Sequence, residues 1–227
     1  MVMAIPIRID FVSDIVCPWC AIGLRALEEA MRRVGDAASV ELHFQPFELN
    51  PDMPAEGENI DAHLMRKYGI STADVARNRE QIRQRGEALG FAFRVRPDGR
   101  IYNTFDAHRL LHWAGVEGKQ HALKLALLRC YFSDGGNPAD HATLIALTSA
   151  VGLDAQRAQQ ILDSDTFTAE VRKRQRFYTS HGISAVPSVI FNERQLIQGG
   201  QPVEAFEQAL RQLARDTLKS GGVVDPA

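Results

Sequence analysis

The chain has 227 residues, of which 45% are hydrophobic and 24% charged, a composition typical of a globular protein with one sizeable core. Its 26 basic and 28 acidic residues give a net charge of −2, so nothing in the charge balance favours nucleic acid or an anionic membrane as a partner. No apolar stretch approaches the ~20 residues of a transmembrane helix, and the N-terminus lacks the pattern of a secretory signal. We therefore expect a cytoplasmic protein.

The first 50 residues predict a strand, a helix and a second strand. Residues 5–12 alternate apolar and polar side chains, as a half-buried strand does, and residues 40–44 form a second such segment. A strand, a helix and a strand in this order predict a βαβ unit with two parallel strands. The helix between them carries one apolar stripe at spacings of three and four residues, made by Cys20, Leu24, Leu27, Met31 and Val34.

Helical patterns fill the middle of the chain, and strands return near its end. A loop rich in Pro and Asn follows the second strand, and Gly and Pro residues separate the helices. Strands are then expected at 188–192 and 195–198, and a final helix at 202–218. The helices of the middle block are expected at 60–68, 72–89, 104–115, 119–133, 139–151, 155–163 and 167–180.

Strands that are divided between the two ends of a chain most simply join in one sheet. We therefore expect a discontinuous α/β domain made by residues 1–50 and 181–220, with a helical insertion domain at 51–180. The last residues, 221–227, should form a flexible tail.

The stretch DIVCPWCAIG places two cysteines, Cys17 and Cys20, where the first helix begins. A thiol at a helix N-terminus faces unpaired N–H groups and the positive end of the dipole, which favour the thiolate. Pro18 fits the first turn, where its missing N–H costs nothing. Because Cys20 lies on the apolar stripe, we expect an exposed Cys17 that attacks or is attacked, and a buried Cys20 that resolves the mixed disulfide.

The sequence gives less support to two other uses of these cysteines, a structural disulfide and a zinc site. A disulfide-stapled framework needs more than the three cysteines of this chain, and Cys130 lies in an apolar helix where a packed core thiol is expected. Structural zinc usually needs four protein ligands, and the chain has no second CxxC. His108 and His112 stand four apart but lack the glutamate of HExxH and lie far from the cysteines, so we expect no metal.

A second feature supports redox chemistry. In GISAVPSVIFN, Pro187 directly precedes a strand that should lie in the sheet. Proline is disfavoured inside a central strand, but a cis proline at the start of a strand is a known device. A CxxC that follows a strand and opens the helix of a βαβ unit is itself typical of a thioredoxin-like redox site.

These segments together resemble the DsbA-like branch of the thioredoxin superfamily, and most closely its cytoplasmic FrnE-like members. The resemblance rests on CPWC, the helical insertion, GISAVPSVIFN and QLIQGGQP, and extends to FELNPDMPAEG, YNTFDAHRLLHWAG and YFSDGGNPAD. It implies an α/β, thioredoxin-like fold (βαβ + ββα) with a large all-helical insertion. It also implies a thiol–disulfide oxidoreductase that acts on protein or small-molecule thiols.

The resemblance further implies roles for single residues. Cys17 would be the nucleophile, Cys20 the resolving thiol, and Pro187 a cis proline opposite them, while the backbone of Val186 pairs with a bound peptide. The Cys17–Cys20 disulfide would be redox-active, with no bound cofactor and with glutathione open as a reductant. The DsbA dipeptide between the cysteines is Pro-His, whereas Trp19 cannot carry charge, so we expect a weaker oxidant.

The residues after Tyr102 face the active site in that family. Asn103, Thr104 and His108, together with Trp19 and Val186, are therefore candidates to line the substrate groove; the alternative is that Asn103 or Thr104 only caps a helix and that His108 is solvated.

Three further possibilities stay open. Kappa-class glutathione transferases and 2-hydroxychromene-2-carboxylate isomerases have the same layout, but they usually carry Ser in place of Cys17 and lack the resolving cysteine. A chaperone-like binding module would use the insertion to hold partners. A homodimer would pair apolar surface of the insertion.

Overall fold

The computed structural model describes residues 5–94, 96 and 98–219; the expected flexible tail, 221–227, lies outside the described residues. The main sheet has the order β2-β1-β5-β6. Strand β1 (Ile5–Ser13) is parallel to β2 (Ala38–Pro46) and antiparallel to β5 (Ser188–Phe191), which pairs with β6 (Gln195–Gln198). The two ends of the chain therefore join in one sheet, and the predicted α/β fold is confirmed.

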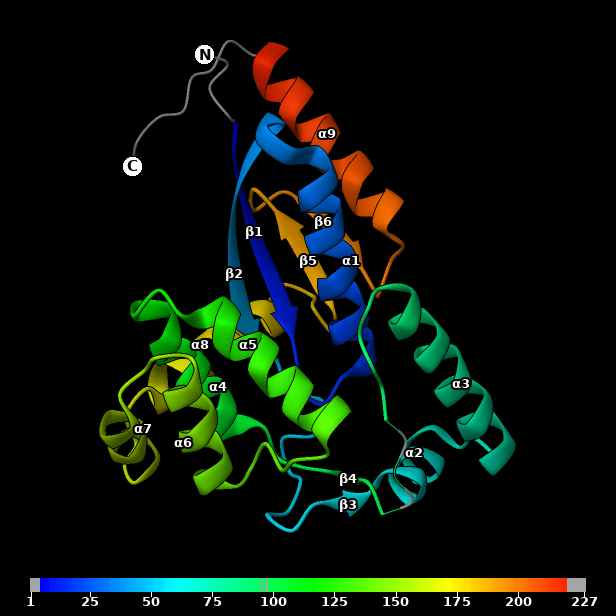
Figure 1. Cartoon of the computed structure of the whole chain (residues 1–227), viewed down its shortest axis with the longest axis vertical. Coiled ribbons are helices and arrows are strands. Elements are labelled where there is room, and N and C mark those ends of the chain that lie inside the picture. Colours follow the sequence, from blue (N-terminus) through cyan, green and yellow to red (C-terminus); the bar gives the residue numbers. More distant parts are fainter. Residues whose placement is uncertain (1–4, 95, 97, 220–227) are drawn as a thin grey trace.

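Helices α1 (Pro18–Val34) and α9 (Val203–Lys219) lie side by side against one face of this sheet (Figure 1). Strand β1 alternates its side chains, so that Ile7, Ile9 and Phe11 enter the core beneath these helices. Val12 enters the core on the other face, where it packs with Tyr178. Cys17 and Cys20 belong to the larger core, on the α1 side.

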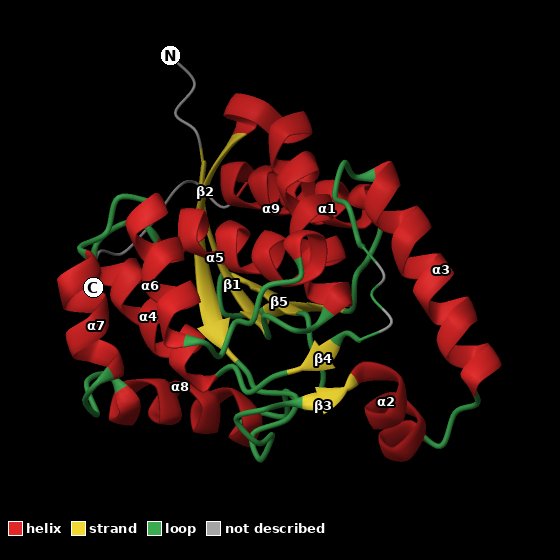
Figure 2. Ribbon diagram, turned by 60° about the horizontal axis from the view of Figure 1, so that its bottom comes forward, coloured by secondary structure: helices red, strands yellow, loops and turns green. Residues whose placement is uncertain are grey.

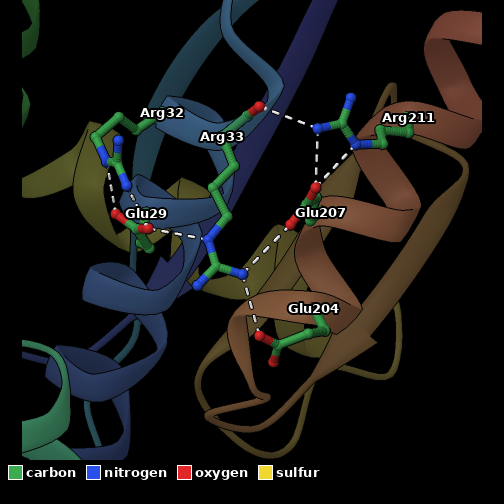
Figure 3. A network of polar contacts seen from close by, with 6 residues as sticks. All are labelled: Glu29, Arg32, Arg33, Glu204, Glu207 and Arg211. Atoms are coloured by element: carbon green, nitrogen blue, oxygen red, sulfur yellow. Dashed lines mark hydrogen bonds and ion pairs between the residues drawn. The ribbon is translucent and has the colours of Figure 1, made fainter.

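The outer surfaces of α1 and α9 are joined by charged side chains (Figure 3). The Arg33 guanidinium donates to Glu29 on its own helix, and to Glu204 and Glu207 of α9 at 3.1 and 3.4 Å. Arg211 of α9 donates to Glu207 and to the carbonyl oxygen of Arg33. Because these pairs are exposed to solvent, they orient the two helices more than they stabilise them.

Residues 60–180 form helices that surround the lower half of the sheet in Figure 1. Their bounds differ from the predicted ones by at most four residues. The helix expected at 119–133 ends at Arg129 and continues as a π-helical turn, Cys130–Asp134. The helices are α2 (Ile60–Tyr68), α3 (Thr72–Ala88), α4 (Phe105–Val116), α5 (Gln120–Arg129), α6 (His141–Ala150), α7 (Ala155–Leu162) and α8 (Thr168–Ser180).

One part of this region was not predicted. Strands β3 (Glu58–Asn59) and β4 (Arg100–Ile101) pair with each other beside α2 (Figure 2). Two residues are too few for an alternating pattern, so sequence alone gives no signal for them. A short 3₁₀ turn, Gly35–Ala37, links α1 to β2.

Substitution of Phe206 measures how much the core beneath α1 and α9 contributes to stability. Its side chain is fully buried, so Phe206→Ala should lower the free energy of unfolding by about 3–5 kcal/mol through lost burial and a cavity. Arg33→Ala, which removes the charged link in Figure 3, should cost far less, and its effect should fade in high salt. Denaturant titration of both variants checks this; equal losses would contradict it.

Candidate active site

The four residues that lead into α1 are each held by a different part of the molecule. Asp14 is buried and accepts hydrogen bonds from the backbone N–H groups of Ile15 and Leu49, both at 2.7 Å. Ile15 lies in the core of the helical insertion, Val16 packs with Met53 and Ile101, and Cys17 belongs to the core of the sheet. The start of α1 is therefore fixed where the two parts of the fold meet.

The two cysteines lie one turn apart at the beginning of α1. Cys17 occupies the N-cap position, where no side chain caps the helix, and the N–H of Cys20 donates to the Cys17 carbonyl at 3.1 Å. No disulfide bond joins the two cysteines in this structure. Burial raises the pKa of Cys20 well above its usual value, and a hydrogen bond with Cys17 and the charge of that thiolate raise it further. Cys20 therefore stays a thiol until a proton acceptor is provided.

The predicted exposure of Cys17 is wrong. Only 4% of the residue is accessible, against 0% for Cys20, so the two thiols differ less than helix periodicity suggests. The cause is tertiary: the loop before β5 lies over the helix start, and the Cys17 Sγ donates to the Val186 carbonyl oxygen at 3.6 Å. A disulfide substrate must therefore approach along this loop.

Val186 and Pro187 form the wall opposite the dithiol, and the peptide bond between them is cis. The Pro187 ring packs on α1 at Gly23, where a Cβ atom would lie 3.1 Å from the Pro187 Cγ. The Pro187 carbonyl accepts a hydrogen bond from Gly199 N–H at 2.8 Å. By contrast, the N–H of Val186 has no hydrogen-bond partner among the described residues, so this group is available to a bound chain.

Trp19 is half-buried beside the dithiol, between α3 and the turn that follows β6. The Arg85 guanidinium lies 5.5 Å from the centre of the indole ring and donates to the Gly200 carbonyl oxygen at 2.6 Å. A Cβ atom at Gly200 would lie 3.1 Å from the Trp19 carbonyl oxygen, so this turn needs a glycine to approach α1. The role of Trp19 in substrate binding stays a prediction.

Asn103 and His108 lie on the insertion side of the site, in different surroundings. Asn103 donates to the carbonyl oxygens of Pro51 and Met53 and accepts from Phe105 N–H at 2.9 Å, so it joins the 51–53 turn to the start of α4. The N-cap position itself is Thr104, whose side chain makes no capping hydrogen bond. His108 is 3% exposed, which rules out the solvated alternative. Whether either residue contacts substrate stays a prediction.

Behind the dithiol, His108 and Asp14 form a buried pair. Their Nε2 and Oδ1 atoms are 3.5 Å apart, and His108 Nε2 is also 3.0 Å from the Phe47 carbonyl oxygen. Burial alone would raise the pKa of Asp14, but hydrogen bonding and the charge of His108, with hydrogen bonds from Leu49 and Thr104, bring it below its usual value.

Three residues of this site were missed by the sequence reasoning. Gly23 and Asp14 flank the motif, but a glycine in a helix and an acid before it have many other uses. Lys124 is fully buried in α5, and here a signal existed. It stands three and four residues before Leu127 and Leu128, so a charged residue occupies the apolar stripe of the helix.

A recess of about 260 Å³ opens beside the first turn of α1. Val16 and Pro18 contribute to its wall, together with Tyr102 and Tyr131. Its polar lining is mainly positive, since four arginines contribute: Arg79, Arg94, Arg96 and Arg100. The recess therefore combines apolar surface with groups that favour anions.

The described part of the chain contains neither a metal-binding cluster nor a membrane-spanning helix. No three His, Cys, Asp or Glu side chains of residues 5–94, 96 and 98–219 cluster in a way that could hold a metal ion. Within the same residues, no helix is both long and apolar enough to cross a bilayer.

Comparison with known proteins decides the family. The family model described as DSBA-like thioredoxin domain matches residues 8–211. The chain belongs to this family. It is 32% identical to a probable DsbA oxidoreductase from Streptomyces coelicolor, whose crystal structure superimposes with a TM-score of 0.86. The match covers 97% of this chain and 92% of that protein. The narrower resemblance to FrnE-like members stays a prediction.

Two more distant relatives complete the comparison. The chain is 26% identical over 205 residues to the uncharacterized protein YwbO of Bacillus subtilis. This match covers 90% of this chain and 96% of YwbO. The cytosolic disulfide reductase DsbM of Pseudomonas aeruginosa, solved with glutathione, is 16% identical with a TM-score of 0.63, and the match covers 92% of this chain and 99% of DsbM. At that identity the likeness concerns the fold alone.

The buried pair of Asp14 and His108 can be tested through the pH dependence of the free energy of unfolding. Because its pKa is lowered in the folded protein, Asp14 adds stability above its unfolded value of 3.8, and this is lost as the pH falls towards the folded value. Asp14→Asn should therefore lower the free energy of unfolding by about 1–3 kcal/mol at pH 7 and should flatten the stability curve below pH ~4.

Denaturant titrations between pH 2 and 8 measure both effects, and Asp36→Asn on the exposed turn after α1 is the matched control. An Asp14→Asn curve parallel to that of the wild type through the acid range would contradict the assignment.

Proposed function

We propose that this member of the DSBA-like family is a thiol–disulfide oxidoreductase that exchanges electrons through Cys17 and Cys20. The observation that carries the proposal is the placement of the Cys17 Sγ at the N-terminus of α1, opposite the Val186–Pro187 segment, with a second, fully buried thiol one turn behind it. A thiolate at a helix N-terminus is stabilised by the backbone, and the second thiol can reach the first.

Reduction of a substrate disulfide would take two steps. The Cys17 thiolate attacks one sulfur, forming a mixed disulfide and releasing the other sulfur as a thiolate. The Cys20 thiolate then attacks the Cys17 sulfur, which forms the Cys17–Cys20 disulfide and releases the second substrate sulfur. Oxidation of a dithiol is the same sequence in reverse, so the arrangement supports either direction.

The free N–H of Val186 supports binding of an extended substrate. A peptide that lies along this segment would accept a hydrogen bond from Val186, as an added strand does at a sheet edge. Trp19 and the arginine-lined recess both lie at the first turn of α1, next to Cys17. These features favour protein thiols and small thiols that carry carboxylates, and they make glutathione a reasonable reductant of the Cys17–Cys20 disulfide.

A cytoplasmic location would suit such a reductant. It is supported by the low cysteine count and by the likeness in fold to a reductase described as cytosolic. Trp19, between the two thiols, offers no positive charge to the thiolate, which supports a weaker oxidant than a Pro-His enzyme but does not select oxidation, reduction or isomerisation. The homodimer stays a prediction.

A glutathione-dependent isomerase or transferase is the second candidate, since the same fold and an anion-favouring recess would serve it. The intact pair of cysteines disfavours it, because such an enzyme needs no resolving thiol. Turnover that survives the loss of Cys20 would separate the two functions.

Variants of the three cysteines test the proposal in an insulin-reduction assay with glutathione as the electron source. Cys17→Ser should abolish activity, because no nucleophile is left at the helix start. Cys20→Ser should still attack but should accumulate the mixed disulfide on Cys17, visible as a mass adduct. Cys130→Ala, a change in a buried thiol away from the site, is the control and should keep the wild-type rate.

Retention of the wild-type rate by Cys17→Ser would refute the proposal. So would a Cys20→Ser protein that forms no adduct with a disulfide reagent.

A further inference from the structure

Lys124 is the one buried lysine among those whose side chains the structure describes. It lies in α5 with 0% of its surface accessible, and its Nζ makes no hydrogen bond with any described residue. The centre of the Phe44 ring lies 5.9 Å from Nζ. A buried ammonium without a partner is costly, so a lysine at this position needs an explanation.

The helix directs Lys124 towards the dithiol. Leu128, one turn further along α5, lies in the same core cluster as Cys17 and Cys20, and residues four apart share one helix face. The charge of Lys124 acts on three groups where β1 leads into α1: Cys20, Asp14 and Cys17. Helix α5 itself packs on β2, beside β1 (Figure 1).

Lys124 also has a route to solvent. It lines a cavity of about 230 Å³ between β2, α4, α5 and α8, with Gln120 beside it and the exposed Val116 at the rim. The other titratable or charged groups that line this cavity are His43, His108, His112 and Arg174. Water that enters the cavity comes close to the Lys124 side chain, so a small movement of the lining would let the buried Nζ exchange its proton.

The proposed exchange has an unmet need at this point. Cys20 must lose its proton before it attacks Cys17, yet the thiol is fully buried. The buried carboxylate nearby, Asp14, is already hydrogen-bonded to Ile15 and Leu49 and lies against His108. Lys124 is a buried basic group whose charge acts on Cys20 and whose nitrogen has no hydrogen-bond partner among the described residues.

We propose that Lys124 is the proton acceptor and donor of Cys20. This inference rests on the proposed function and assigns the proton step within it. When Cys20 attacks the mixed disulfide, its S–H proton passes to neutral Nζ, a bond forms between Cys20 Sγ and Cys17 Sγ, and the substrate sulfur leaves as a thiolate. In reverse, a substrate thiolate breaks the Cys17–Cys20 bond, and the Lys124 ammonium protonates the Cys20 thiolate that leaves.

The electrostatics agree with this role. Burial lowers the pKa of Lys124, although the negative charges of Cys20, Asp14 and Cys17 oppose the effect, and burial raises the pKa of Cys20. Burial therefore favours the neutral form of both groups, the thiol of Cys20 and the amine of Lys124, and these are the forms from which the proposed transfer starts.

The test separates the two steps of exchange. Reduced protein carrying Cys130→Ala is mixed with excess 5,5′-dithiobis(2-nitrobenzoate) in a stopped-flow instrument, and the release of nitrothiobenzoate is followed. The first equivalent reports attack by Cys17, and the second reports attack by Cys20 on the mixed disulfide. Lys124→Met and Lys124→Gln remove the amine, and Lys119→Met, at an exposed position before α5, is the matched control.

Lys124→Met and Lys124→Gln should leave the first phase unchanged and should slow the second roughly 100-fold at pH 7, the low end of general acid–base contributions. Their second phase should also rise tenfold per pH unit into the alkaline range, where the wild-type rate has levelled. Two neutral variants are used so that one remains if the other does not fold.

An unchanged second phase, or an equal slowing of both phases, would overturn the assignment.

A separate experiment distinguishes proton transfer from charge alone. In Lys124→Ala, methylamine should accelerate the second phase, whereas tetramethylammonium, a cation without a proton to exchange, should not; equal acceleration by both would overturn proton transfer. Failure of the proposed function is recognised separately, by the absence of the first phase in protein that has Lys124.

Discussion

Strand β1 is hydrogen-bonded on both sides, and the site at its carboxyl end depends on this double pairing. On one side Ser13 pairs with Pro46 of β2, and on the other Val12 pairs with Ser188 of β5. The chain continues from β1 through Asp14 to Cys17, while Pro187 immediately precedes β5. The register therefore brings Cys17 and Val186, which are 169 residues apart, to the same end of the sheet. Without the β1–β5 pairing the thiols would have no facing wall.

The contact between Pro187 and Gly23 completes this arrangement. A side chain at Gly23 would meet the proline ring at 3.1 Å, so the absence of one lets the loop lie directly on α1. The same closeness buries Cys17, which is why its thiol is almost inaccessible although it starts a helix. Reactivity at this site thus comes from backbone geometry and a narrow approach, and exposure contributes little.

The interior behind the thiols is unusually polar for a protein core. Asp14 and His108 satisfy each other and nearby backbone groups, as buried polar groups generally do. Lys124 is the exception, since its amine is buried with no hydrogen bond to a described residue. A structural role would be served better by leucine at that position, so its cost in stability is most simply explained by proton transfer at Cys20.

Much of this could be predicted from sequence because it is local. Periodicity placed the helices of the insertion and the strands of the main sheet, and the CPWC motif with Val186–Pro187 pointed to the dithiol and its wall. The burial of Cys17 could not be predicted, since it depends on a loop 169 residues away. Strands β3 and β4 are too short to give a pattern. The partners of His108 and the surroundings of Lys124 belong to other elements, and a single sequence does not show which elements lie together.

The central claim is that Cys17 and Cys20 act as one reversible redox couple. Equilibration of the Cys130→Ala protein in buffers of defined thiol and disulfide ratio, with the free thiols counted after acid quenching, tests it most directly. The account predicts one transition in which both thiols appear together, with a two-electron slope and a potential between roughly −270 and −120 mV, the span of known dithiol oxidoreductases. Two thiols that titrate independently, or that form no intramolecular disulfide under any of these conditions, would contradict it.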